Sequence, residues 1–209
     1  MICRRLRSCG IQAKSPFEIA RGIIGFMKTV QPTLTYPELR LMPDDGKRYE
    51  LIDGEVSVSP SPSEKHQRIS ARLHLSTGNH VERNKLGRVY YAPFDVVFSE
   101  KTALQPDLLF VSSARLGIIG PEYIIGPPDL VVEILSPHRT SYDRVTKLEQ
   151  YALYRVGEYW IIDLMAETIE VYMLTGERYE LRATLGLDQS VTTPLLPGWQ
   201  LAVRDLFAQ

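Results

Sequence analysis

The chain has 209 residues, of which 44% are hydrophobic and 23% are charged, proportions typical of one globular domain. It holds no apolar run of roughly 18 residues, so we expect no membrane-spanning helix. The net charge of −1 argues against a protein that coats nucleic acid through bulk positive charge, without excluding a local basic groove.

The first 26 residues are basic and lack the apolar core and cleavage site of a secretory signal. We expect residues 1–26 to be a poorly ordered N-terminal extension and residues 27–209 to form a single domain. Cys3 and Cys9 lie in this extension with no histidine close to them. Two such thiols predict neither a zinc site nor a disulfide framework, which is typical of a cytoplasmic protein.

The first predicted element is a β-hairpin. Residues 49–52 and 55–58 are rich in strand-forming residues, and Asp53-Gly54 between them suits the positive φ angles of a tight turn. The following Ser-Pro-Ser-Pro segment, residues 59–62, ends the strand pairing.

Ser63 is placed to cap a helix that begins near Glu64. Helical spacing puts one set of residues on the side facing the core: His66, Ile69 and Leu73. It puts basic residues on an adjacent stripe: Lys65, Arg68 and Arg72.

Further strands and one helix complete the expected fold. Short β-rich runs occupy residues 89–91, 94–98 and 107–111. Residues 129–135 form a continuous apolar run, which predicts a central strand covered on both faces. A helix from about Ser141 to Arg155 follows, and then a strand pair at residues 158–163 and 168–174. This order predicts an α/β (α+β) fold with a mixed sheet flanked by helices.

Glu133 lies in the middle of the apolar central strand. An unpaired carboxylate there would cost several kcal/mol, so it needs a cation, a hydrogen-bond network or a raised pKa. Strand alternation puts Glu133 on the same face as Val131 and Leu135. A structural ion pair and a functional metal site both satisfy these conditions. Glu133→Leu should stabilise the metal-free protein, since it removes a buried charge from an apolar strand.

Asp107 follows Pro106 at the start of a second apolar strand. It could simply cap a turn, as aspartates at such positions commonly do. Together with Glu133, however, it offers two hard oxygen ligands on neighbouring strands. Such a pair suits Mg²⁺, whose octahedron water and phosphate can complete.

The helix after the central strand carries a polar stripe of Asp143, Lys147 and Tyr154, with Tyr151 beside it. Its expected core stripe consists of Val145, Leu148 and Ala152. The polar stripe could face a site, although contact with solvent is the commoner outcome.

Three further residues could stand near the metal. His66 could be a neighbour of the ion or a general base, and a histidine satisfied at the edge of the core is the alternative. Glu50 and Glu55 flank the hairpin turn and could supply outer carboxylates, although hairpin glutamates usually lie on the surface.

The sequence resembles the Uma-two family of prokaryotic proteins described as endonucleases, within the PD-(D/E)XK, restriction-endonuclease-like superfamily. The resemblance runs from about Tyr36 to Phe207. It rests on the following segments in this order: residues 49–55, Ser59-Pro60, His66, residues 92–96, 105–108 and 128–137, Asp143-Arg144, Lys147, Tyr151 and residues 158–160.

This resemblance implies that Asp107, Glu133 and the backbone carbonyl of Ile134 bind Mg²⁺, for which Mn²⁺ can substitute. It adds Asp95 and Tyr151 to the expected surroundings of the ion. The superfamily pattern requires a lysine two residues after the glutamate, where this chain has Leu135. The resemblance implies that Lys147 replaces it as the third catalytic residue.

The expected activity is Mg²⁺-dependent hydrolysis of nucleic-acid phosphodiester bonds, with DNA as substrate and a homodimer as the assembly. The candidate phosphate contacts are Lys65, Arg68, Arg72 and Arg139. Two alternatives remain: a catalytically silent domain of nuclease fold that binds nucleic acid or a protein, and a structural oligomer.

Overall fold

The computed structural model describes residues 33–136 and 142–208. The predicted extension at residues 1–26, with Cys3 and Cys9, lies outside the described residues, and so does Arg139. None of the described helices is both long enough and apolar enough to cross a membrane.

The helical segments are α2 (Tyr36–Leu39), α3 (Glu64–Asn84), a 3₁₀-helix (Ser113–Ile118), a π-helix (Tyr142–Lys147), α4 (Leu148–Leu153) and α5 (Val203–Phe207). The strands are β1 (Arg48–Ile52), β2 (Glu55–Ser59), β3 (Gly87–Tyr91), β4 (Asp95–Ser99), β5 (Thr102–Leu104), β6 (Leu108–Ser112), β7 (Tyr123–Ile125), β8 (Leu130–Ile134), β9 (Glu158–Asp163), β10 (Thr168–Thr175), β11 (Arg178–Leu185), β12 (Ser190–Val191) and β13 (Leu201–Ala202).

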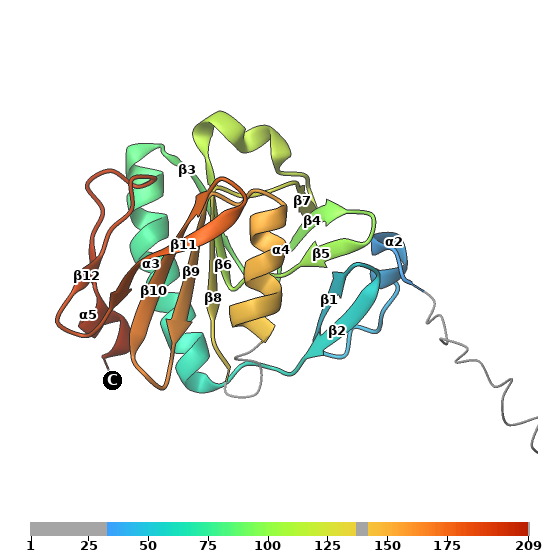
Figure 1. The fold of residues 1–209 in the computed structure, drawn as a ribbon, viewed down its shortest axis with the longest axis horizontal. Helices are drawn as coiled ribbons and strands as arrows, with labels where there is room; N and C mark the ends of the chain where they lie inside the picture. The colour runs from blue at the N-terminus through green and yellow to red at the C-terminus, as the bar shows by residue number, and fades with distance from the viewer. Residues whose placement is uncertain (1–32, 137–141, 209) are drawn as a thin grey trace, which may run out of the picture. The chain divides into compact units, whose positions relative to one another are not determined.

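A six-stranded mixed sheet in the order β11-β10-β9-β8-β6-β3 forms the centre of the described fold (Figure 1). β8 pairs antiparallel with β6 and parallel with β9, so the chain must cross over between β8 and β9, and α4 lies in this crossover. The predicted mixed sheet with flanking helices is therefore confirmed, although the strands divide among more than one sheet.

A second sheet of five strands, in the order β2-β1-β5-β4-β7, contains the predicted hairpin. β1 pairs antiparallel with β2, and the turn residues Asp53 and Gly54 have φ angles of 51° and 85°. Positive φ at both positions is what a two-residue turn of this kind requires. The hairpin prediction is confirmed.

The helix α3 begins where the sequence predicts. The Ser63 side chain accepts a hydrogen bond from the backbone amide of His66, and His66, Ile69 and Leu73 are buried. The helix therefore presents the predicted side to the six-stranded sheet. His66 lies in the first turn of α3, and its imidazole contacts Asp107, directly before β6.

The six-stranded sheet is covered on both faces. One core contains residues of α3, of alternate positions in β6 and β8, and of the C-terminal segment, among them Ile69, Leu108, Val132 and Leu206. The other core contains the remaining alternate positions with residues of α4 and the five-stranded sheet, among them Leu109, Val131, Tyr151 and Val96.

All five residues of β8 are buried. Val131 and Leu135 belong to the core on the α4 side, whereas Val132 and Ile134 belong to the opposite core. This division confirms the predicted alternation, and it assigns Glu133 to the α4 side of the sheet.

The predicted helix from Ser141 to Arg155 is replaced by the π-helix followed by α4. Val145, expected in the core, is 55% exposed, whereas Lys147, expected in solvent, is 4% exposed. Because a π turn contains more residues than an α turn, side chains within and after it point in different directions from those predicted by 3.6-residue spacing. The predicted core stripe is wrong at Val145, and so is the solvent-facing orientation that helical periodicity alone favoured for Lys147.

Candidate active site

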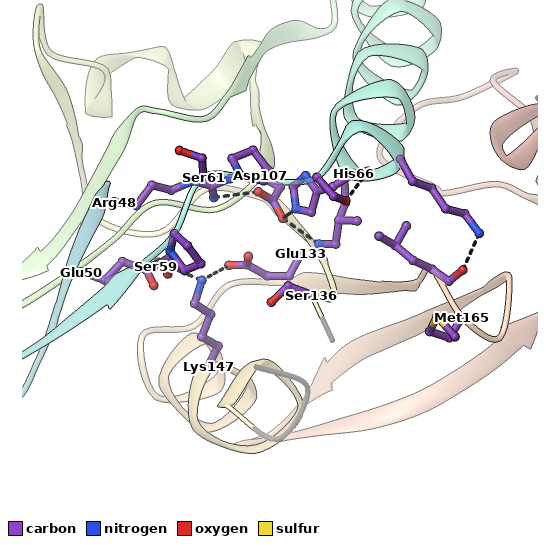
Figure 2. Close-up of a pocket in the computed structure, with 16 residues that line it drawn as sticks. Arg48, Glu50, Ser59, Ser61, His66, Asp107, Glu133, Ser136, Lys147 and Met165 are labelled. Carbon is purple, nitrogen blue, oxygen red and sulfur yellow. Dashed lines mark hydrogen bonds and ion pairs between the residues drawn. The ribbon is translucent and has the colours of Figure 1, made fainter. Parts of the chain in front are cut away.

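A pocket of about 390 Å³ lies where the hairpin, the start of α3, the end of β8 and the start of the α4 region meet (Figure 2). Its lining residues are Arg48, Glu50, Ser59, Pro60, Ser61, Pro62, Ser63, Lys65, His66, Asp107, Glu133, Ile134, Ser136, Lys147, Leu164 and Met165. The pocket therefore contains most of the residues that the sequence singled out.

Asp107 is 3% exposed and lies directly before β6. Its Oδ1 accepts a 2.7 Å bond from Arg48, while its Oδ2 accepts a 2.8 Å bond from the amide of Ile134 and lies 3.1 Å from His66 Nε2. Burial alone would raise the pKa of Asp107. The His66 hydrogen bond and charge, the Arg48 charge and the Ile134 amide outweigh burial and lower this pKa to about 2.

Glu133 is 2% exposed and has partners on the helix that follows its strand. Its Oε1 accepts a 2.9 Å bond from Lys147 Nζ and a 2.6 Å bond from the Tyr151 hydroxyl. Burial, with the charges of Glu133 and Glu50, raises the pKa of Tyr151 well above its ordinary value. Tyr151 therefore stays protonated and donates to the Glu133 carboxylate.

The side chain of Lys147 contacts both strand β1 of the hairpin and the central strand β8. Its Nζ lies 2.8 Å from Glu50 Oε1, in addition to the contact with Glu133. Glu50 itself is 2% exposed and accepts a 3.0 Å bond from the backbone amide of Gln105. One buried ammonium group therefore lies between two buried carboxylates, which satisfies the charge requirement that the sequence imposes on Glu133.

The structure brings most of the predicted site residues together. Asp107, Glu133, Ile134, Lys147, Glu50 and His66 line the pocket, and Tyr151 contacts it through Glu133. Glu55 is exposed and lies outside the pocket lining.

Asp95 lines a separate hollow of about 240 Å³. There it accepts bonds from the Tyr36 hydroxyl and from the side chain of Gln105. Because the Gln105 backbone binds Glu50, Asp95 is connected to the site only indirectly through this residue.

Of the predicted phosphate contacts that the structure describes, Lys65 alone lines the pocket. Its Nζ donates to the carbonyl of Leu164 at 2.7 Å and to Glu167 at 3.0 Å. Arg72 donates to the carbonyls of Leu206 and Ala208, and Arg68 also donates to that of Ala208. These two arginines satisfy carbonyl groups at the end of α5, which would otherwise have no intrahelical partner.

Sequence reasoning missed Arg48, whose guanidinium group donates to the Asp107 carboxylate. Burial lowers the pKa of Arg48, but the nearby Asp107, Glu133 and Glu50 carboxylates outweigh this effect and raise it. The sequence did contain an indication of this role, because Arg48 and Glu50 are two residues apart in one strand and so share a face.

The donor chemistry of the pocket fits a hard cation. Asp107, Glu133 and the Ile134 carbonyl offer only oxygen ligands, and Mg²⁺ is commonly held by one or two carboxylates with water and substrate phosphate. Among residues 33–136 and 142–208, no group of three or more His, Cys, Asp or Glu is disposed to hold a metal ion. A site here would thus depend on the two acids, the carbonyl and non-protein ligands.

The family model described as "Uma2: Putative restriction endonuclease" matches residues 36–204. The chain belongs to this family. The resemblance to Uma-two proteins seen in the sequence is thereby confirmed, and the matched range includes every residue of the pocket.

This Uma2 chain also resembles a crystal structure described as a putative nuclease belonging to DUF820 from Anabaena variabilis. The TM-score is 0.69 at 22% identity, and the match covers 84% of this chain and 98% of the other. At that identity the likeness establishes the fold alone. A comparison with curated proteins finds no match.

Proposed function

We propose that this Uma2 protein is an endonuclease that uses Mg²⁺ to hydrolyse phosphodiester bonds in nucleic acid, with DNA as the expected substrate. The observation that carries the proposal is the position of Lys147. It is buried in the same pocket as Asp107, with its ammonium group 2.9 Å from Glu133. The chain thus supplies a cationic group beside Glu133, in the pocket that Asp107 also lines, although Leu135 occupies the position of the superfamily lysine.

Asp107, Glu133 and the carbonyl of Ile134 would hold the ion. The amide of Ile134 donates to Asp107, and in a β-strand the amide and carbonyl of one residue point to the same side. This backbone geometry supports a carbonyl directed toward the Asp107 carboxylate. Mn²⁺, another ion that accepts oxygen ligands, should substitute for Mg²⁺.

When bound, Mg²⁺ would neutralise charge on a non-bridging phosphate oxygen and lower the pKa of a water molecule. Lys147 would hold its proton at Nζ and donate it in a hydrogen bond to the charge that develops on the phosphoryl group. Arg48 and His66 would fix the orientation of Asp107 through their contacts with its two oxygens. The N-terminal end of α3 would favour the approach of a phosphate, because the backbone amides of its first turn carry partial positive charge.

A silent nucleic-acid-binding domain is the second candidate, and one observation favours it. Asp107 is bound by Arg48, and Lys147 binds both Glu133 and Glu50, so these carboxylates have cationic partners within the protein. A metal ion must share or displace these partners. Activity with a divalent cation therefore decides between the two candidates.

The test compares cleavage of single-stranded and duplex DNA and RNA in Mg²⁺, in Mn²⁺ and in EDTA. We expect cleavage by the unmodified protein with either metal, and loss of cleavage by at least about a hundredfold in Asp107→Asn and Glu133→Gln. Circular dichroism should show that both variants remain folded. Cleavage in EDTA, or equal cleavage by the variants, would disprove the metal assignment, and inactivity toward all substrates would favour the silent domain.

A further inference from the structure

The pocket has two chemically different ends. Arg48, Glu50 and Lys147 lie together at one end, whereas Met165 lies on the side away from them (Figure 2). Leu164 and Met165 belong to the turn between β9 and β10. A site that handled only a phosphate group would need the charged end alone, so the second end requires its own explanation.

Met165 is 82% exposed although it lines the pocket. Its turn is firmly held, because Asp163 Oδ1 accepts 2.9 Å bonds from the backbone amides of Met165 and Ala166. On the other side, Lys65 Nζ donates a 2.7 Å bond to the carbonyl of Leu164. These contacts fix the backbone of the turn. The apolar side chain of Met165 therefore stays at the edge of the pocket, where a ligand can cover it.

The Ser-Pro-Ser-Pro segment contributes further apolar surface through Pro60 and Pro62, which also line the pocket. Each proline fixes its own φ angle and restricts the residue before it to extended conformations. This part of the pocket is therefore preorganised, and a ligand that packs against it orders little additional chain.

We propose that the pocket accepts one unstacked nucleotide, with its phosphate at the charged end and its base against Pro60, Pro62, Leu164 and Met165. The proposal rests on the proposed function and specifies its substrate as single-stranded or locally unpaired nucleic acid. A volume of about 390 Å³ matches a small-molecule site and cannot contain a duplex. A base in a duplex is stacked between its neighbours and must leave the stack to enter, which costs least where the strand is already unpaired.

Binding measurements test the base contact without requiring cleavage. The probes are a fluorescent oligothymidylate and an abasic sugar-phosphate strand of the same length, with Ca²⁺ in place of Mg²⁺. We expect Met165→Ala to weaken oligothymidylate binding about fivefold, because much of the apolar side-chain surface covered by the base is lost. The same substitution should leave binding of the abasic strand unchanged.

Leu41→Ala is the matched control, because Leu41 is 83% exposed and lies outside the pocket lining. It should change neither binding constant, and Met165→Leu should retain most of the oligothymidylate affinity. The same pair of measurements with oligouridylate asks whether the strand is DNA or RNA. A Met165 dependence with either strand supports the base contact.

The inference would be overturned if Met165→Ala weakened binding of neither strand. It would also be overturned if fully paired duplex bound as tightly as the single strand. Such a result would leave the apolar end available to a protein partner instead. Cleavage in Mg²⁺ is measured in parallel, so the two proposals fail separately. Cleavage that is independent of Met165 contradicts the nucleotide pocket, whereas Met165-dependent binding without cleavage contradicts the nuclease.

Discussion

At the scale of single residues, the site consists of buried charges that depend on one another. Glu133 and Glu50 share the ammonium group of Lys147, and Tyr151 donates to the same Glu133 oxygen. Burying such groups costs free energy that only good geometry and complete hydrogen bonding recover. These contacts change what a substitution at Glu133 should do.

Glu133→Leu should destabilise the metal-free protein, contrary to the expectation from the sequence. The substitution removes the acceptor of the buried Tyr151 hydroxyl, and a buried polar group that loses its partner costs about 1–3 kcal/mol. Urea unfolding in EDTA measures the loss. In Glu133→Leu/Tyr151→Phe the hydroxyl is also absent, so the double variant should recover most of the stability. A single variant as stable as the unmodified protein would contradict this account.

The sequence predicts individual residues where local rules apply. Strand alternation is sufficient to place Glu133 on the face of Val131, and the need for a partner follows from its apolar neighbours. The identity of that partner does not follow, because Lys147 reaches Glu133 only through the crossover after β8. The family resemblance supplied Lys147, whereas helical periodicity favoured solvent for it.

At the scale of elements, the π-helix explains this failure of periodicity. The six residues Tyr142–Lys147 precede the regular turns of α4, and the wider turn changes which side chains face the sheet. Lys147 and Tyr151 are four residues apart and therefore share a helix face, and in this orientation both reach Glu133. Nothing in local propensity distinguishes a π turn from an α turn, so the change in direction was not predictable.

Two substitutions test the observed helix orientation. Val145→Gln should change the free energy of unfolding by no more than about 0.5 kcal/mol, because Val145 is 55% exposed. Ala152→Gln should destabilise by about 1–3 kcal/mol, because Ala152 is 7% exposed and a longer side chain overpacks the core. Thermal unfolding of both variants measures these two changes in stability. A larger loss for Val145→Gln than for Ala152→Gln would restore the regular helix predicted from the sequence.

The strands show a similar limit. The strongly patterned β8 and the hairpin were predictable, but β5 and β7 contain only three residues each. Such short segments carry too few alternating positions to be recognised. β5 and β7 pair with neighbouring strands of the five-stranded sheet. Without these two strands, the sequence indicated a single mixed sheet.

At the scale of the whole molecule, several of the described basic side chains bind partners within the fold. The net charge is −1, and Arg68 and Arg72 bind carbonyl groups at the end of α5. Arg144 likewise binds Asp163 and Glu170. Among the described residues, the lysine and arginine side chains that line the pocket are Arg48, Lys65 and Lys147. A substrate should therefore be bound at a compact site without a long track of phosphate contacts.

This distribution predicts a weak dependence of binding on salt. At most three phosphate contacts to a single strand should give a slope no steeper than about −2 when log K is plotted against log salt concentration. Lys65→Ala should reduce the magnitude of the slope by about 0.7, the contribution of one contact. Arg72→Ala should leave the slope unchanged and lower the melting temperature, since it removes a donor to the carbonyls of Leu206 and Ala208. Titrations of labelled single strand at increasing KCl measure all three slopes. A slope near −5, or one that becomes shallower in Arg72→Ala, would mean that the α3 arginines leave the C-terminal carbonyls to bind phosphate, as the sequence alone suggested.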